Sequence, residues 1–264
     1  MTNPSCRVRS GTVPAVATAA MLVLAGTGPG VADEAFARMR IDDMSRYLSA
    51  QTTLSFNFDT SLDIVTLDDQ KLSIASSGSL ALERPDRLRV VRRGGFATVE
   101  ATYDGKTLTV LNRTANAYAQ AERAGDIDGL VTHLHDDLGY PVPGADLLLS
   151  NSGSILMKRA TDVKDLGSGV IGGAECDHFA VRTAEVDWQI WIAQGDAAYP
   201  CRYVITNKAV AGWPEYRLDV TAWGAGSEPA SFVFVPPAGA KMMDVQSIPD
   251  LDDVAGVFVM KGAN

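Results

Sequence analysis

The sequence predicts an α+β fold that is mainly β, in which a long antiparallel sheet curls beneath a helical lid. Segments of alternating apolar and polar residues run through most of the chain. Helical spacing of apolar residues appears in only two regions, near the N-terminus and in mid-chain. The 264 residues are 46% hydrophobic and 21% charged, which suits one globular domain, and no repeat or linker divides the sequence.

The N-terminus has the pattern of a signal peptide. Arg7 and Arg9 precede an apolar run over residues 13–26, and small residues follow it up to Ala32. A membrane anchor needs about 20 apolar residues, and this run is shorter. A lipoprotein would need a cysteine at the cleavage site, whereas Cys6 lies before the apolar run. We therefore expect residues 1–32 to be removed on export, leaving a soluble mature protein without a transmembrane segment.

The charge of the chain argues against nucleic acid as a partner. The net charge is −9, and loss of the two arginines of the leader makes it −11. An acidic exported protein has no electrostatic attraction for nucleic acid or for anionic lipid headgroups.

The first element of the mature chain is an amphipathic helix over residues 33–51. Its apolar residues recur at spacings of two to four, and Asp33 and Glu34 lie in its first turn, where acids suit the helix dipole. The period then changes to two, which predicts about five consecutive antiparallel strands, over residues 53–67, 71–83, 86–93, 95–104 and 106–112. Asp104-Gly105 is a strong signal for a tight turn between the last two.

Residues 125–151 interrupt the sheet with a second helical region. Ile127, Leu130, Val131, Leu134 and Leu138 have helical spacing, and the sequence "YPVPG" separates them from a short helix over residues 145–150. About six strands are predicted to follow, over residues 153–163, 174–183, 187–193, 201–209, 215–224 and 230–237. The tail beyond Pro236 gives no clear assignment.

A sheet of this length tends to curl, and its inner face cannot cover itself. The two helical regions are the available covers, so the sequence predicts an apolar groove between sheet and helices. The residues expected to line it belong to the first two strands: Leu54, Phe56, Phe58, Leu80 and Leu82.

Several segments resemble known families. "GSLALERPDRLRVV", "YDGKTLTVLN", "AYAQA" and "PGADLLL" resemble the bacterial outer-membrane lipoprotein carriers of the LolA/LolB group. "CDHFAVRTAEVDWQIWIAQGD" and "PCRYVITNK" are more specifically similar to a family of predicted periplasmic proteins, a domain of unknown function grouped with that fold. The resemblance covers roughly residues 33–237.

The resemblance implies an incomplete antiparallel barrel with a helical lid over an apolar cavity. The half-barrel domain would span residues 33–240, with its helical insert near 125–151, and residues 241–264 would form an unassigned tail. The implied location is the periplasm of a Gram-negative bacterium. In the carriers, the arginine before the proline of the "ERP" motif hydrogen-bonds to the lid, and the matching residue is Arg84. The alternative is that Arg84 is a solvated strand end. A longer second half, the tail and a cysteine pair depart from the carriers.

"CDHFAVR" brings Cys176, Asp177 and His178 together, but it indicates a structural strand. In a strand, Asp177 points away from the face of Cys176 and His178, so it cannot orient the histidine for catalysis. A zinc site needs four ligands, and Cys176, His178 and Cys201 supply three. A disulfide needs only Cys176 and Cys201, and an exported protein favours one. Since one strand of the meander separates them, we expect Cys176 in the approach to its strand.

Two function classes remain. The first is a non-catalytic binding or carrier protein for a hydrophobic small molecule, a lipid or the acyl chains of a lipoprotein. The second is an interaction or sensor module that binds another envelope protein through the same curved sheet. The sequence contains no motif for hydrolase, metalloprotease, phosphate or dinucleotide chemistry, so we expect no enzyme activity, metal or cofactor.

The export prediction can be checked directly. N-terminal sequencing of protein from the envelope fraction is expected to find Asp33 as the first residue, within a few positions. An intact Met1 in that fraction would contradict it.

Overall fold

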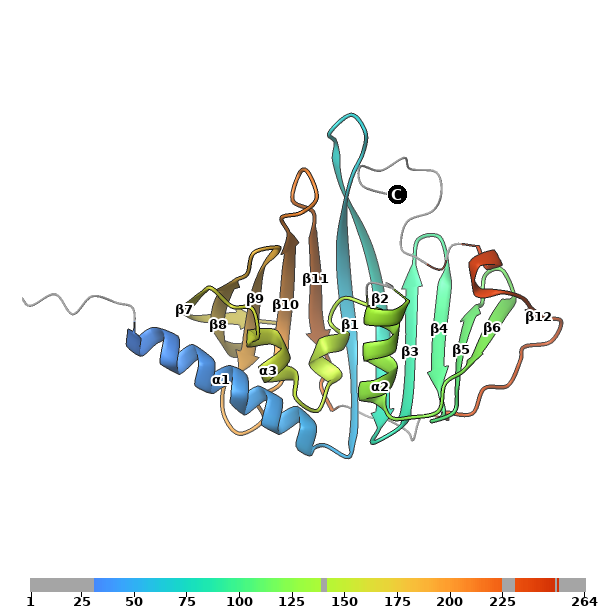
Figure 1. Cartoon of the computed structure of the whole chain (residues 1–264), viewed down its shortest axis with the longest axis horizontal. Coiled ribbons are helices and arrows are strands. Elements are labelled where there is room, and N and C mark those ends of the chain that lie inside the picture. Colours follow the sequence, from blue (N-terminus) through green and yellow to red (C-terminus); the bar gives the residue numbers. More distant parts are fainter. Residues whose placement is uncertain (1–30, 139–141, 225–230, 250, 252–264) are drawn as a thin grey trace, which may run out of the picture.

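The computed structural model describes residues 31–138, 142–224, 231–249 and 251, so all but the last two residues of the predicted leader lie outside them. Its main feature is a twelve-stranded sheet with helices over one face (Figure 1). The elements are α1 (Val31–Ala50), β1 (Thr53–Val65), β2 (Lys71–Glu83), β3 (Arg87–Gly94), β4 (Thr98–Tyr103), β5 (Thr107–Asn112), β6 (Ala117–Glu122), α2 (Ile127–Thr132), α3 (Ser152–Met157), β7 (Asp162–Ile171), β8 (Ala174–Arg182), β9 (Val186–Ala193), β10 (Pro200–Asn207), β11 (Glu215–Thr221) and β12 (Lys241–Met242).

The sheet is two antiparallel meanders joined side by side. Its strand order is β12-β6-β5-β4-β3-β2-β1-β11-β10-β9-β8-β7, so β1 and β11 join the two halves. The pairing of β12 with β6 is parallel, and β12 and β7 form the two edges. The predicted curled, antiparallel, open sheet with a helical cover is confirmed.

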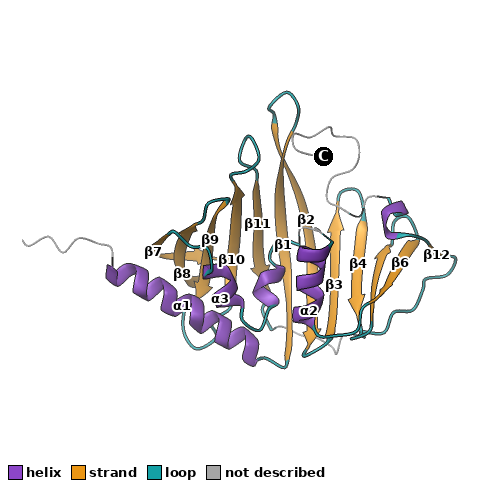
Figure 2. Ribbon diagram, viewed as in Figure 1, coloured by secondary structure: helices purple, strands orange, loops and turns teal. Residues whose placement is uncertain are grey.

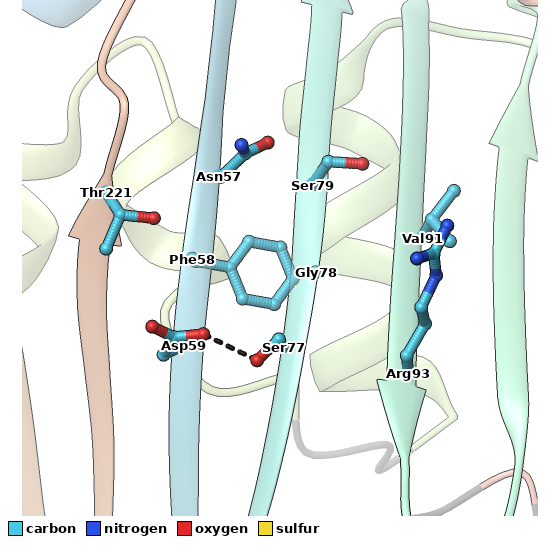
Figure 3. Close-up of a pocket in the computed structure, with 9 residues that line it drawn as sticks. All are labelled: Asn57, Phe58, Asp59, Ser77, Gly78, Ser79, Val91, Arg93 and Thr221. Carbon is cyan, nitrogen blue, oxygen red and sulfur yellow. Dashed lines mark hydrogen bonds between the residues drawn. The ribbon is translucent and has the colours of Figure 1, made fainter.

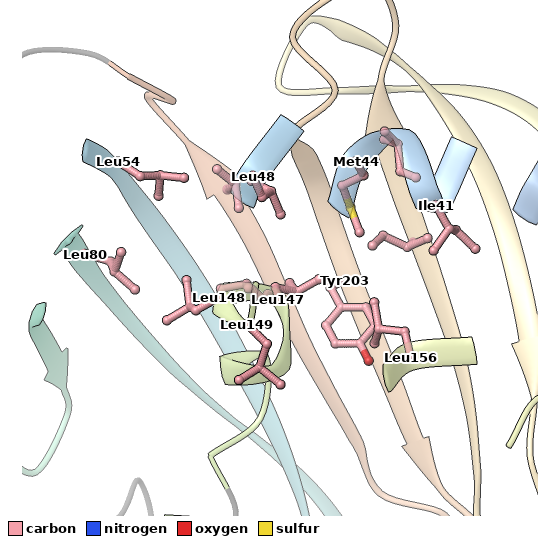
Figure 4. Close-up of a cluster of buried hydrophobic side chains, with 14 of the residues drawn as sticks. Ile41, Met44, Leu48, Leu54, Leu80, Leu147, Leu148, Leu149, Leu156 and Tyr203 are labelled. Atoms are coloured by element: carbon pink, nitrogen blue, oxygen red, sulfur yellow. The ribbon is translucent and has the colours of Figure 1, made fainter. Parts of the chain in front are cut away.

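Helices cover one face of the sheet (Figure 2). One side of α1 is fully apolar, and Ala37, Ile41, Met44 and Leu48 are buried along it. Figure 4 shows part of this stripe facing the cluster formed by Leu147, Leu148, Leu156 and Tyr203. Side chains at this spacing share one helix face, so this apolar stripe packs α1 against the core. No helix among the described residues is long and apolar enough to cross a membrane.

The helical insert between β6 and β7 forms the lid, which we define by its described residues, 127–138 and 142–157. Asp126 begins it by accepting a hydrogen bond from the backbone N–H of Gly129 (2.8 Å), as an N-cap residue does. A wider turn over His133–Asp137 and a 3₁₀ turn over Ala145–Leu148 follow α2. The helical character predicted for residues 125–151 is therefore confirmed in the described part of this segment.

The lid ends in a helix where the sequence predicted a strand. Residues 153–157 belong to α3, and the next strand begins only at Asp162. A Cβ on Gly153 would lie 3.0 Å from Cβ of Ser45, so glycine allows α3 to approach α1 closely. The Ser45 hydroxyl accepts a hydrogen bond from the Gly153 N–H (3.0 Å), and Leu156 is buried. Residues 153–157 are therefore stabilised as a helix by contact with α1, and not as a strand by backbone hydrogen bonds to a neighbouring strand.

The predicted last strand is also wrong in its described part, residues 231–237, which form no ladder. This segment contacts the first half of the sheet instead, through the Phe234 ring, 5.1 Å from that of Tyr118. The chain then pairs with the edge strand β6 through β12, and Ile248 packs on Ala117 and Ala119. The described part of the tail therefore wraps the edge of the sheet. The division at residue 240 remains a prediction.

The Cys176–Cys201 disulfide predicted from the sequence is present, with 6.8 Å between the Cα atoms. Cys176 does not lie in the approach to its strand: it is the third residue of β8 and pairs with Ala193, the last residue of β9. Strands two positions apart are about 9.6 Å from each other. A register shift between Pro200 and Arg202 makes Cys201 a bulged residue, which shortens the distance over the end of β9.

The neighbours of Cys176 have structural partners. The His178 ring stacks on Trp191, with 3.8 Å between ring centroids, and Nε2 lies 3.0 Å from Oε1 of Gln189. Burial lowers the pKa of His178. Asp177 points to the opposite face, where its carboxylate accepts a hydrogen bond from Nε of Arg40 on α1 (2.8 Å). The cluster therefore ties a helix and three strands together.

The disulfide gives a stability prediction. Replacing both Cys176 and Cys201 with alanine is expected to lower the free energy of unfolding by about 2–4 kcal/mol, because the cross-link restricts the unfolded chain. Denaturant unfolding measures the loss. In the unreduced wild type both thiols should resist alkylation, and two freely labelled cysteines would rule the bond out.

Candidate ligand cavity

A cavity of about 1620 Å³ lies between the concave face of the sheet, α1, the lid and the tail. Typical small-molecule pockets are roughly 300–1,000 Å³, so this one can hold a larger ligand. The sheet lines it with Leu54, Phe56, Phe58, Leu80, Leu88, Val90, Val110, Ala119, Leu218 and Val220. The helices and the tail add Leu48, Leu130, Val131, Leu134, Leu147, Leu148, Met242, Met243, Val245, Ile248 and Leu251, and Trp223 lines the cavity from the turn after β11.

The structure places most of the predicted ligand residues on this cavity. Leu54, Phe56, Phe58, Leu80 and Arg84 line it. Leu82 lies in the packed core, 2% exposed, and is not among the lining residues. Alternation along a strand predicts which face a side chain takes, but not whether a helix packs directly on it.

Phe58 owes its position to the glycine opposite it. Its ring lies across Gly78 of β2 (Figure 3), and a Cβ on Gly78 would come within 2.4 Å of that ring and 2.3 Å of the Val91 carbonyl oxygen. A second, smaller hollow of about 350 Å³ surrounds this point. It is lined mainly by polar side chains, including Asp59 and Ser77, which hydrogen-bond to each other (2.5 Å). The large cavity, and not this hollow, therefore has a mainly apolar lining.

Arg84 lies at the contact between sheet and lid. Its Nη2 donates a hydrogen bond to the carbonyl oxygen of Leu148 in the lid (2.9 Å), and its Nε is buried without a partner among the described residues. Burial lowers the pKa of Arg84, while the nearby charge of Asp128 raises it. The Asp128 carboxylate also accepts hydrogen bonds from the Ser150 N–H (3.1 and 3.2 Å). Arg84 is thus in contact with the lid, as the resemblance implied, and is not a solvated strand end.

A second polar contact ties the lid to the other half of the sheet. The Tyr203 hydroxyl on β10 donates a hydrogen bond to Oδ2 of Asp146 (3.3 Å). Burial raises the pKa of the Asp146 carboxyl, with this hydrogen bond acting in the opposite direction. Burial also raises the pKa of Tyr203 well above its ordinary value. The lid therefore rests on two strands that lie on either side of β1.

The two ends of the cavity differ in polarity. Thr53 pairs with Glu83 at one end of the β1–β2 ladder, where Leu54, Leu48 and Trp223 line the wall. Arg84 also lines the cavity at this end, with its guanidinium hydrogen-bonded to the lid. Val65 pairs with Lys71 at the other end, and Asp63, Asn207 and Glu215 line the cavity on that side. The arrangement suits an amphiphile, with an apolar body under the helices and a polar group at the far end.

Sequence reasoning missed several lining residues. The lid leucines had a visible signal, since Leu130 and Leu134 follow the helical period. Trp223 had none, because it lies beyond the end of β11, and the tail residues gave no assignable pattern. No group of three or more metal-binding side chains gathers within the described part of the chain.

Comparisons with known proteins place the chain in a family. The model of the family described as "Predicted periplasmic protein (DUF2092)" matches residues 37–246. No curated protein sequence matches the chain.

Solved structures give distant matches. The lipoprotein LppX of Mycobacterium tuberculosis is 13% identical, with a TM-score of 0.46 over 74% of this chain and 98% of its own. The MucA/MucB complex of Pseudomonas aeruginosa is 17% identical, with a TM-score of 0.44 over 74% of this chain and 59% of the matched one. A LolA superfamily protein from Nitrosomonas europaea is 10% identical, with a TM-score of 0.33 over 73% of this chain and 94% of its own. Likenesses of this size carry no conclusion about ligands.

The family match extends from the second turn of α1 to the described part of the tail, and so includes the sheet, the lid and most of the cavity wall. It confirms the family resemblance and the periplasmic location predicted from the sequence. The chain belongs to the family of predicted periplasmic proteins designated DUF2092.

Proposed function

We propose that this protein is a non-catalytic binding or carrier protein that holds an acyl chain, or another elongated apolar ligand, between its sheet and its lid. The observation that carries the proposal is the cavity of about 1620 Å³. Its walls are mainly aliphatic and aromatic side chains, and burying each methylene of a ligand contributes about 0.8 kcal/mol. A ligand bound mainly by burial of apolar surface needs no catalytic group.

We further propose that Arg84 is a latch between sheet and lid. It holds the lid through one hydrogen bond to the Leu148 carbonyl, and its Nε has no partner among the described residues. A single hydrogen bond to a charged donor contributes about 1.5–3 kcal/mol, which is enough to favour the closed lid and small enough for a ligand to overcome.

The carrier proposal is tested by looking for the ligand. Native mass spectrometry of protein purified from its own periplasm should show a bound apolar molecule, and the apoprotein should bind a fluorescent fatty acid. Phe58→Glu places a charge on the cavity wall and should abolish probe binding. If the wild type carries no ligand and binds no probe, the carrier proposal fails, and binding of another envelope protein becomes the leading function.

Two substitutions by alanine distinguish a residue on the cavity wall from a residue in the packed core. Leu82→Ala is expected to lower the free energy of unfolding by about 2–5 kcal/mol, because it empties space in the core. Phe58→Ala is expected to cost less than the ~3–5 kcal/mol typical of a core phenylalanine, because part of its surface already faces the cavity. Denaturant unfolding of ligand-free protein measures both. A full core penalty at Phe58 would contradict its place on a ligand wall.

The latch is tested with a matched pair of arginine variants. Arg84→Leu is expected to speed release of the bound probe severalfold with little change in stability, because it removes the hydrogen bond to Leu148 and a partly unpaired buried group. Arg87→Leu is the control, since Arg87 is exposed and lies 4.0 Å from Asp86 in a surface ion pair. Stopped-flow displacement of the probe measures release. Equal release rates in both variants and the wild type would eliminate the latch.

A further inference from the structure

A stack of three aromatic rings stands at the apolar end of the cavity. The Trp223 ring lies between those of Tyr199 and Phe56, with centroid distances of 4.8 and 5.4 Å and interplanar angles of 8° and 15°. Phe56 and Trp223 line the cavity, whereas Tyr199 is not among its lining residues and supports the stack from behind. The indole is therefore held between a wall residue and a residue outside the cavity.

Several other contacts fix the indole in place. Its Nε1 donates a hydrogen bond to the hydroxyl of Tyr47 near the end of α1 (3.2 Å). Just beyond, the N–H of Gly224 donates to the carbonyl oxygen of Ser55 on β1 (2.9 Å). The residue before Trp223 is Ala222, whose φ of 52° lies in the left-handed region that most non-glycine residues avoid. This turn redirects the chain at the end of β11 and sets the indole against β1 and α1.

The position of the stack relative to the polar groups gives the ligand a direction. Ser55, which bonds to Gly224, lies at the end of β1 where the ladder with β2 reaches Glu83. Asp63 lies toward the opposite end of β1, and Glu215 lies on the neighbouring strand β11 at that same end. A polar headgroup costs free energy in an apolar wall unless it is hydrogen-bonded, so it belongs at the end that carries several polar side chains or opens to water.

We propose that Trp223 is the end wall of the cavity and limits the length of the acyl chain that this protein binds. This inference rests on the proposed function, and it names the class of ligand as a single-headed amphiphile whose chain end meets the indole. Each methylene up to the wall adds about fourfold in affinity, from the transfer free energy of one buried methylene. A longer chain must fold back or leave part of itself in water, so the gain stops there.

The Trp223 ring can limit the length of the acyl chain because it is held rigidly. A flexible aliphatic side chain can change rotamer to admit another methylene, whereas a ring stacked on both faces and hydrogen-bonded at its edge must lose these contacts to move. The tail, by contrast, contributes Met242 and Met243 to the wall, and methionine side chains are unbranched and adaptable. The aromatic end is therefore the one expected to set a sharp cutoff.

The test is a chain-length profile. Wild-type apoprotein loaded with a fluorescent fatty acid is titrated with the even-numbered saturated acids from octanoic to eicosanoic acid. Its affinity should rise along the series and then level off or fall. Trp223→Ala should move that break to longer acids by at least one member of the series. Trp223→Phe, which keeps a stacking ring, should move it less, and Trp213→Ala, at an exposed tryptophan, should leave it unchanged.

Different results would contradict the carrier function and the end-wall role of Trp223. Absence of binding by the wild type at any length would remove the carrier function together with this inference. Binding by the wild type with the same break in Trp223→Ala would overturn the end wall alone and leave the carrier function standing.

A second measurement covers the case in which Trp223→Ala does not fold. A fatty acid brominated at its terminal carbon should quench the tryptophan fluorescence of the wild type more than that of Trp223→Phe. The same acid brominated next to its carboxyl group should quench both proteins equally. If the terminal bromine quenches the wild type no more than it quenches Trp223→Phe, the chain end does not meet the indole and the inference is wrong.

Discussion

The apolar concave face of the sheet is the constraint on which the rest of this structure depends. An open sheet of twelve strands cannot bury that face on itself, so other parts of the chain must cover it. Three segments do so: α1 over the second half, the lid over the centre and the described tail at the β6 edge. These three segments do not cover the concave face completely, and the space left between them and the sheet is the cavity.

The two halves of the sheet are held in different ways. In the second half, the disulfide joins β8 to β10, and Arg40 ties α1 to β8 through Asp177. In the first half, the floor includes the small residues Ala101, Ala119 and Ala121, and the cover there is a tail that pairs over only two residues of β12. Covalent and ionic ties restrain one side, whereas loosely paired chain covers the other. Any change of cavity shape on ligand binding is therefore expected in the first half.

Much of this fold could be predicted from the sequence, because alternation and helical spacing record local burial. The strands from β1 to β5, the helix α1 and the sheet face of Phe58 followed from those periods, whereas β6 (Ala117–Glu122) was not among the predicted strands. The periods failed for α3, where contact with α1 decides the structure, and for residues 231–237, where β-like composition occurs without a ladder partner. Periodicity could not show that Leu80 lines the cavity whereas Leu82 lies in the core, because that depends on where the helices end. It also could not place Trp223 on the cavity, because that depends on how the chain turns after β11.

The size of the cavity bears on the state of the protein without ligand. Empty apolar space costs about 24 cal/mol per Å³ in core truncations, so a dry void of 1620 Å³ would cost roughly 40 kcal/mol. A whole domain is stable by only about 5–15 kcal/mol. The space must therefore be occupied by ligand or open to water, and the polar end near Asp63 and Glu215 is the natural place for water to enter. Because a ligand that binds only the folded state stabilises it, occupancy and stability are linked in this protein.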